Sequence, residues 1–166
     1  MTDLVRAPGD PVADQRWLSL AIQLSRRSER SRSAFSVGAI LVAASGDVIA
    51  TGWSREAGPA DHAEELALRR ATGGKTRPDL ADGGDLSAAT LYSSLEPCCR
   101  RSSRPVSCAE LIVAAGVRRV VIAWREPPVF QPGGGVAWLT WRGVTVVEVP
   151  GLEGAARAVN AHLIGH

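Results

Sequence analysis

Residues 89–124 read ATLYSSLEPCCRRSSRPVSCAELIVAAGVRRVVIAW, and this stretch predicts a strand, a helix and a second strand. Residues 89–94 and 118–124 are short, largely apolar runs of strand length. Residues 109–115 have a helical composition, and Gly116 is well placed to end that helix. Because parallel strands need a crossover connection, which is usually a helix, we expect these two strands to be parallel.

The sequence before this stretch predicts a helix and a β-hairpin. Residues 15–28 carry apolar side chains on one face and follow Asp14, which is expected to cap the helix. The apolar run 37–43 (VGAILVA) and residues 48–52 flank the turn Ser45-Gly46-Asp47. Two such runs around a short polar turn predict a hairpin.

The remaining elements alternate between helices, loops and one strand. Asp61 is expected to cap a helix that runs to about residue 71, and residues 73–87 predict an exposed loop. After the opening stretch we expect, in chain order, a loop at 127–135, a short helix at 136–141, a strand at 143–149 and a closing helix from Gly151 onward.

The predicted order of elements is α-β-β-α-β-α-β-α-β-α. The later strands are nearly all apolar and are separated by helices, which favours buried parallel strands with helices on both faces of the sheet. Crossovers between parallel strands are expected to be right-handed. The sequence therefore predicts an α/β protein, a three-layer α/β/α sandwich around a five-stranded mixed sheet.

Length and composition bound the class of protein. The chain has 166 residues, 45% of them hydrophobic and 22% charged, which suits one soluble domain. We expect that domain over residues 14–166, after a flexible N-terminal arm at 1–13. The sequence has no apolar run near the roughly 20 residues of a membrane span, and its polar start lacks the core of a signal peptide. We therefore expect a cytoplasmic protein that does not enter a membrane.

The charge gives no sign of a nucleic-acid-binding face. The formal net charge is only +2, whereas such proteins usually concentrate basic residues on one surface. Arg26, Arg27, Arg30 and Arg32 gather at the end of the first predicted helix, where we expect a solvated face. A nucleic-acid partner is therefore not expected.

The cysteines point to a metal or to catalysis. Cys98, Cys99 and Cys108 are the three cysteines of the chain, and they fall within eleven residues. An odd and tightly clustered set does not fit a disulfide framework. In a reducing compartment such clusters more often bind a metal or take part in a reaction.

Three short pieces of sequence carry the candidate chemistry: His62-Ala63-Glu64, Glu96-Pro97-Cys98 and Cys108. The first two begin where a helix is expected after a strand, and open α/β sheets bind ligands at the carboxyl ends of strands. Zinc takes imidazole and thiolate readily. Three ligands, His62, Cys98 and Cys108, would leave its fourth position open to water, whose pKa falls to about 7 on zinc.

Glu64 is the candidate catalytic residue. It lies two residues after His62, so its carboxylate can approach that water without binding the metal, and can shuttle a proton to the ring nitrogen and the leaving amine. An H-x-E motif with a later P-C-x-x-C is the known signature of zinc deaminases, and this chain resembles it with a wider spacing between its cysteines. The alternative is that His62 is a capping or surface residue and that the cysteines form a small buried patch.

The choice between Cys98 and Cys99 stays open at this point. Only one of the two adjacent cysteines is expected to bind zinc, because four protein ligands would close the water position. Cys98 directly follows Glu96-Pro97, which favours it, and Cys99 would then be a buried bystander.

The chain resembles the cytidine-deaminase-like superfamily, and within it the deaminase half of the bifunctional riboflavin-biosynthesis enzyme. The wide spacing is the discriminating feature, because nine residues separate Cys98 from Cys108 where other deaminases usually have two. The pieces that carry the resemblance are Val37-Gly38, Gly52-Trp53, His62-Ala63-Glu64, Leu66-Ala67-Leu68, Leu91-Tyr92, Leu95-Glu96-Pro97-Cys98, Cys108-Ala109-Glu110-Leu111-Ile112, Ala114-Ala115-Gly116-Val117 and Arg119-Val120-Val121.

The resemblance implies a fold and further site residues. It implies a sheet in the order 2-1-3-4-5 and a homodimer or homotetramer. It also implies that the backbone around Ser94 helps to hold the leaving amino group and that Arg104 faces the substrate. Arg100 and Arg101 are expected to be solvated. Trp53 follows the strand that leads to His62, so it is a candidate for the pocket wall.

The resemblance implies zinc-dependent deamination of a small aminopyrimidine, with the riboflavin-pathway pyrimidine as the first candidate. Where that family carries Asn-Pro, this chain has Ala34-Phe35-Ser36 before Val37-Gly38. This form resembles free-nucleoside cytidine deaminases, in which the aromatic ring lies near the base, so Phe35 is a candidate substrate contact. A cytidine-like or antibiotic-pathway nucleoside is thus the alternative substrate, followed by a tRNA or other nucleic-acid substrate and by a catalytically silent zinc-fold protein.

Overall fold

The computed structural model describes residues 8–73 and 85–164, and they form one five-stranded sheet in the order β2-β1-β3-β4-β5. The elements are α1 (Pro11–Ser25), β1 (Gly38–Val42), β2 (Val48–Trp53), α2 (Ala63–Thr72), β3 (Thr90–Ser93), α3 (Cys108–Ala115), β4 (Arg119–Ile122), α4 (Gly135–Trp141), β5 (Thr145–Glu148), the short 3-10 helix η2 (Pro150–Leu152), α5 (Glu153–Val159) and α6 (Ala161–Ile164).

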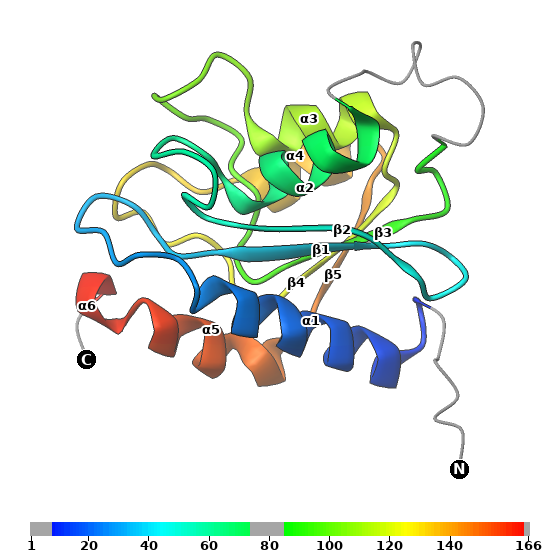
Figure 1. Ribbon diagram of the computed structural model, residues 1–166, viewed down its shortest axis with the longest axis horizontal. Coiled ribbons are helices and arrows are strands. Elements are labelled where there is room, and N and C mark those ends of the chain that lie inside the picture. Colours follow the sequence, from blue (N-terminus) through cyan, green and yellow to red (C-terminus); the bar gives the residue numbers. More distant parts are fainter. Residues whose placement is uncertain (1–7, 74–84, 165–166) are drawn as a thin grey trace.

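The pairing of the strands confirms the predicted mixed sheet. β1 is antiparallel to both of its neighbours, β2 and β3, whereas β3, β4 and β5 are parallel. Helices α1, α5 and α6 cover one face of the sheet and α2, α3 and α4 cover the other (Figure 1). The three-layer sandwich and the strand order 2-1-3-4-5 are therefore confirmed. In the described residues, no helix is both long and apolar enough to cross a bilayer.

The first helix begins earlier than the sequence predicts. Asp10, not Asp14, is its N-cap, and the Asp10 carboxylate accepts hydrogen bonds from the amides of Val12 and Ala13. Pro11 starts the helix because its fixed φ angle and missing amide suit the first helical position. Residues 11–13 of the predicted arm therefore belong to α1, which ends at Ser25, and residues 1–7 lie outside the described residues.

Asp61 does not cap α2, contrary to the prediction. His62 occupies the N-cap position and makes no side-chain capping bond, and the Asp61 carboxylate pairs with Arg69 and Arg104 instead. The helix ends at Gly73, which has a φ of 63°. Residues 74–84 of the predicted loop lie outside the described residues.

The closing helix is broken into η2, α5 and α6, and Asn160 lies between the last two. The Asn160 side chain accepts a hydrogen bond from the Ser36 amide at 2.7 Å and donates one to the Ser36 carbonyl at 3.0 Å. These bonds hold the segment before β1 from the other end of the chain. They therefore fix the backbone next to Phe35.

Two glycines let helices approach the sheet closely. A Cβ atom on Gly38 would lie 2.0 Å from the Ala21 carbonyl oxygen of α1, and one on Gly52 would lie 2.5 Å from the Ala63 oxygen of α2. Neither position accepts a larger residue without a shift of backbone. Gly52 therefore brings the first turn of α2, and with it His62, against the sheet.

Candidate metal centre and active site

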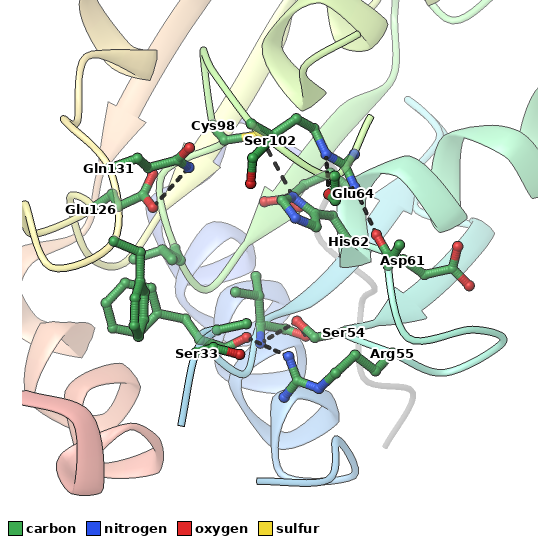
Figure 2. A pocket seen from close by; sticks show the side chains of 18 of the residues that line it. Ser33, Ser54, Arg55, Asp61, His62, Glu64, Cys98, Ser102, Glu126 and Gln131 are labelled. Carbon is green, nitrogen blue, oxygen red and sulfur yellow. Dashed lines mark hydrogen bonds between the residues drawn. The ribbon is translucent and has the colours of Figure 1, made fainter. Parts of the chain in front are cut away.

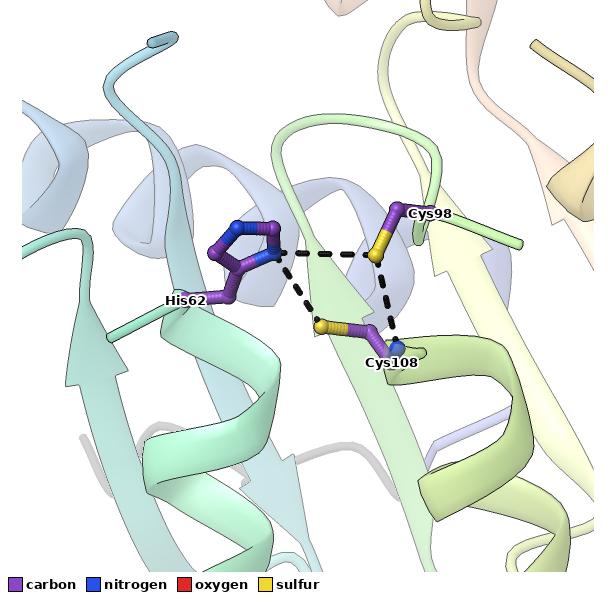
Figure 3. A group of neighbouring side chains, drawn as sticks. All are labelled: His62, Cys98 and Cys108. Carbon is purple, nitrogen blue, oxygen red and sulfur yellow. Dashed lines mark hydrogen bonds between the residues drawn. The ribbon is translucent and has the colours of Figure 1, made fainter. Parts of the chain in front are cut away.

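The structure brings His62, Cys98 and Cys108 together from three separate elements. His62 precedes α2, Cys98 follows β3 and Cys108 is the first residue of α3 (Figure 3). The Nδ1 atom of His62 lies 3.6 Å from the Cys98 Sγ and 3.4 Å from the Cys108 Sγ. All three donor atoms lie within 4.8 Å of one another. One metal ion could therefore bind to all of them.

The start of α3 is fixed by its own cap. Ser107 accepts a hydrogen bond from the Glu110 amide, and the Glu110 carboxylate accepts one from the Ser107 amide at 2.7 Å, which completes a capping box. The Cys108 amide donates to the Cys98 Sγ at 3.4 Å. The N-terminus of α3 therefore orients both cysteines and favours a negative charge on the Cys98 sulfur.

Cys99 is not part of this group. Its Sγ lies 3.8 Å from the Gly133 carbonyl oxygen, on the side of the loop that precedes α4. Adjacent side chains on an extended segment point in different directions, so Cys98 and Cys99 cannot both reach His62. The geometry selects Cys98, which the sequence favours but does not decide.

The chemistry of the donors fits a divalent cation such as zinc. A hydrogen bond from Cys108 and the nearby His62 ring lower the pKa of Cys98 to about 4, although burial opposes this shift. The bond to Cys98 and burial raise the pKa of Cys108 well above its usual value. The two sulfurs thus disfavour a negative charge on both at once, and a bound cation would stabilise both as thiolates. Two thiolates and one imidazole match a catalytic zinc site with an open fourth position.

Glu64 lies beside these donors, in the first turn of α2. Its side chain is buried, and burial raises the pKa of the carboxyl group. The Ser93 Oγ lies 2.7 Å from the Glu64 Oε1 and 2.8 Å from the Leu95 carbonyl oxygen. One hydroxyl proton serves one acceptor at a time, so Glu64 retains the capacity to bind another proton donor.

A pocket of about 290 Å³ opens onto this centre. His62, Glu64 and Cys98 form part of its wall (Figure 2). Phe35 lines it from the segment before β1, and its ring contacts Phe130 edge to face, with centroids 5.1 Å apart. A planar heterocycle can therefore enter beside an aromatic wall and reach the donor group.

A family model for the cytidine and deoxycytidylate deaminase zinc-binding region matches residues 11–124, which hold the whole donor group. The chain belongs to this family. Its curated relatives include riboflavin-pathway enzymes. The diaminohydroxyphosphoribosylamino-pyrimidine deaminase of Schizosaccharomyces pombe is 36% identical over 83% of this chain and 32% of its own length.

Solved structures agree on the deaminase fold. The structure of Acinetobacter baumannii RibD has a TM-score of 0.73 and 32% identity, over 90% of this chain and 38% of that one. The Aspergillus oryzae Rib2 deaminase in complex with DARIPP has a TM-score of 0.70 over 88% of both chains, but its identity of 24% shows the fold alone. The chain spans about a third of the length of the curated relatives it matches.

The deaminase pocket also contains residues that sequence reasoning missed. Glu126, Phe130 and Gln131 come from the loop after β4, and Gln131 donates to Glu126 at 3.1 Å. Burial, above all, raises the pKa of Glu126 to about 7. The signal was available, because Glu126 lies in the loop just beyond the carboxyl end of β4, and β4 pairs with β3, the strand that leads to Cys98.

Arg101 is buried and lines the pocket, so the prediction that it is solvated is wrong. Its side chain is 2% exposed and pairs with Glu65 at 3.2 Å, and it donates to the Ala60 carbonyl at 2.7 Å. The loop between the two cysteines folds back onto the start of α2, which the sequence alone does not show. The physical reason is that buried Glu65 needs a cationic partner.

Three predicted substrate contacts do not line the pocket. Arg104 pairs with Asp61 and Glu65 behind the pocket wall, and its side chain is 40% exposed. The Arg27 guanidinium lies over the Trp53 ring, 5.3 Å from its centroid. Ser94 is buried, and its hydroxyl accepts a hydrogen bond from the Gly38 amide at 3.0 Å. Their contact with a substrate stays a prediction, and Phe35 is the one of the four that reaches the pocket.

Proposed function

We propose that this chain catalyses zinc-dependent hydrolytic deamination of an aminopyrimidine nucleotide, the diaminohydroxyphosphoribosylaminopyrimidine for which its S. pombe relative is named. The observation that carries the proposal is the position of Glu64, a buried carboxylate beside His62, Cys98 and Cys108 at a pocket wall. The 36% identity to that relative supports the substrate. Residues 14–166 would act as one deaminase domain in the cytoplasm.

The proposed mechanism gives each side chain one task. His62, Cys98 and Cys108 hold the zinc ion, which lowers the pKa of water to about 7 when it is bound. Glu64 accepts a proton from the attacking water and passes it to the ring nitrogen. It then takes the second proton from the new hydroxyl on the reacting carbon and gives it to the leaving amine. A C–O bond forms and the C–N bond to the amino group breaks. The products are the corresponding carbonyl compound and ammonia.

The pocket wall supports a division of the substrate contacts. We place the pyrimidine ring against Phe35, because an aromatic face stacks on or packs against a planar base. Arg55 and Arg101 are the basic residues that line the pocket, whereas Arg104 does not. We assign an anionic substituent of the substrate to Arg101, and this contact would compete with its ion pair to Glu65. Ser94 and Trp53 do not line the pocket, so either residue would contact the substrate only after a shift of the pocket wall.

A deamination screen by ammonia release tests the proposal. The zinc-loaded protein is offered the riboflavin-pathway pyrimidine, cytidine, deoxycytidine, their monophosphates and guanine. We expect the largest kcat/KM on the pathway pyrimidine. Ammonia release from none of these compounds, at full zinc occupancy, would overturn the proposed activity, and preference for another compound would overturn the substrate.

The ligand set is tested by zinc content. Cys98→Ala should lose bound zinc because it removes one of three ligands, whereas Cys99→Ala should retain it because Cys99 faces Gly133. Both variants are purified with equimolar zinc present, and the bound metal is measured by atomic absorption. Equal zinc content in the two variants would contradict the assignment of Cys98.

Phe35 also supports a second substrate class. Its ring lines the pocket and packs against Phe130. The two rings offer an apolar wall to a base, which suits a cytidine-like nucleoside. The same screen separates the two classes. A nucleoside deaminase would prefer cytidine or deoxycytidine to every phosphorylated compound, and substitution of Arg101 would then leave its KM unchanged.

We also propose that the chain forms a homodimer or homotetramer. The Trp141 side chain at the end of α4 is 78% exposed, and large aromatic side chains are enriched in protein interfaces. Light scattering behind a sizing column measures the mass of the particle. A monomer of 17.5 kDa at micromolar concentration would contradict this proposal.

A further inference from the structure

Glu96 connects the metal centre to one wall of the pocket. It lies in the Glu96-Pro97-Cys98 segment, two residues before a zinc ligand, and its side chain is buried. The Glu96 Oε1 accepts a hydrogen bond from the Glu126 amide at 3.0 Å, and its Oε2 accepts one from the Val136 amide at 2.7 Å. One carboxylate thus binds the β4–α4 loop, residues 123–134, on both sides: at Glu126 near its start and at Val136 in the first turn of α4.

The β4–α4 loop carries the side chains that face the zinc ligands across the pocket. Glu126, Phe130 and Gln131 line the pocket, and Figure 2 shows Glu126 and Gln131 pointing toward each other on the side of Cys98. The Phe130 ring contacts the Phe35 ring, which also lines the pocket. The position of this loop therefore sets the shape of the substrate pocket.

A second observation shows that the loop is built against Glu96. A Cβ atom on Gly135 would lie 1.9 Å from the Pro97 carbonyl oxygen, and one on Gly133 would lie 3.3 Å from the Glu96 Oε1. Gly134 has a φ of 122°, a conformation that favours glycine. The Glu96 amide also donates to the Trp124 carbonyl at 2.8 Å. The three glycines of this run let the loop backbone close onto the Glu96-Pro97 backbone.

From this geometry we propose that Glu96 is a positioning residue for substrate binding, which fixes the β4–α4 loop relative to the metal centre. Glu96 lines the pocket, and both oxygens of its carboxylate accept hydrogen bonds from backbone amides, those of Glu126 and Val136. The inference rests on the proposed function, because it concerns how that deaminase holds its aminopyrimidine. Loss of the two bonds should weaken substrate binding while the chemical step and the zinc remain.

The test compares Glu96→Gln with wild type, both zinc-loaded. A glutamine keeps the shape of the side chain, but its amide nitrogen faces one of the two backbone amides and cannot accept a hydrogen bond. We expect KM for the riboflavin-pathway pyrimidine to rise on the order of tenfold, with kcat within about twofold, because binding geometry is lost rather than transition-state chemistry. Glu96→Asp retains two acceptor oxygens and should recover part of the loss.

Hydrogen exchange gives a second readout that needs no substrate. Mass spectrometry of peptides that cover residues 125–136 should show faster amide exchange in Glu96→Gln, with unchanged exchange in α1 and equal zinc content. Glu148→Gln is the matched control: it removes a carboxylate that binds Arg125 of the same loop but leaves the Glu126 and Val136 amides bonded to Glu96. Phe130→Ala changes an exposed loop side chain and should raise KM without faster exchange.

Each contrary outcome has a distinct meaning. Loss of zinc from Glu96→Gln would show that Glu96 supports the metal centre, and a fall in kcat at constant KM would show a loss of active protein; either result overturns the proposal. Unchanged exchange over residues 125–136 would overturn it as well. If wild-type protein releases no ammonia from the pathway pyrimidine, the proposed substrate fails, whereas exchange and zinc content still decide the role of Glu96.

Discussion

Strand β3 presents a carboxylate partner on each face of the sheet, and the two sites differ in how fully the carboxylate is bonded. The Tyr92 hydroxyl donates to the Asp14 Oδ1 of α1 at 2.6 Å. The Ser93 Oγ lies 2.7 Å from the Glu64 Oε1 of α2. Consecutive residues of a strand point to opposite faces, so one short strand supports both sites.

Asp14 has several partners and Glu64 has few. Arg119 donates to both Asp14 oxygens, at 3.0 and 2.6 Å, and the Gly9 amide donates to Oδ1. Burial alone would raise the pKa of Asp14, but the bonds from Arg119 and Tyr92 lower it overall. In residues 8–73 and 85–164, Ser93 is the one side chain hydrogen-bonded to Glu64, whose pKa is raised by burial.

This difference separates a carboxylate that holds the fold from one that faces a reaction. A carboxylate with every acceptor position used binds its neighbours tightly and has no capacity left for a substrate. A buried carboxylate with unused acceptor positions is costly to the fold, and such groups are concentrated at functional sites. The comparison predicts that changes on the α2 face alter turnover and that changes on the α1 face alter stability.

The largest effect is expected for Glu64→Gln. This change removes the proton acceptor but keeps the size of the side chain, so we expect turnover to fall by about 10²–10⁴-fold. Zinc content and the free energy of unfolding should stay close to those of wild type. Ammonia release and atomic absorption measure the two quantities. Full activity of Glu64→Gln would contradict the assignment of Glu64 as the reacting carboxylate on the α2 face.

The second effect is the loss of stability in Asp14→Asn. An uncharged amide cannot pair with the Arg119 cation, and we expect the free energy of unfolding to fall by about 2 kcal/mol, less than for a fully buried pair because Arg119 is 24% exposed. Urea unfolding followed by tryptophan fluorescence gives the value. Since Asp14 lies on the far face from the pocket, kcat of the folded variant should equal that of wild type.

Acid should remove the contribution of Asp14. Its pKa is lower in the folded protein than its ordinary value of 3.8, so the ionised group stabilises the fold above that pH. The contribution is lost as the pH falls below 3.8 toward the lower folded pKa. The stability difference between wild type and Asp14→Asn should therefore shrink between pH 6 and pH 3. Loss of zinc in acid affects both proteins, and a difference independent of pH would contradict the prediction.

The smallest effects come from the hydroxyl groups of β3. Tyr92→Phe removes one neutral donor from Asp14 and should cost about 1 kcal/mol of stability with no change in kcat. Ser93→Ala removes the donor to Glu64 and should lower kcat by about tenfold at similar stability. Urea unfolding and ammonia release on the same preparations test both. A lower kcat in Tyr92→Phe together with a lower stability in Ser93→Ala would contradict the assignment of stability to the α1 face and turnover to the α2 face.

Local patterns in the sequence predicted the elements well and their ends less well. The apolar runs and the helix stop at Gly116 marked strands and helices, because hydrophobic periodicity and a left-handed glycine act within a few residues. The predicted start of α1 was wrong, because Asp10 and Asp14 are both residue types that cap helices and the sequence does not separate them. Only the packing of Tyr92 and Arg119 against α1 shows that Asp14 is an interior residue.

The sequence by itself indicated the chemistry of the site: His62, Glu64, Cys108 and one of the two adjacent cysteines are recognisable from residue type and order, since zinc accepts few kinds of ligand. The tertiary structure decided which cysteine faces His62, that Arg101 and not Arg104 reaches the pocket, and that Glu96 binds the β4–α4 loop on both sides. These contacts join residues 30 to 46 positions apart. The physical reason is that a side chain's direction and its distant partners depend on packing, which no local pattern records.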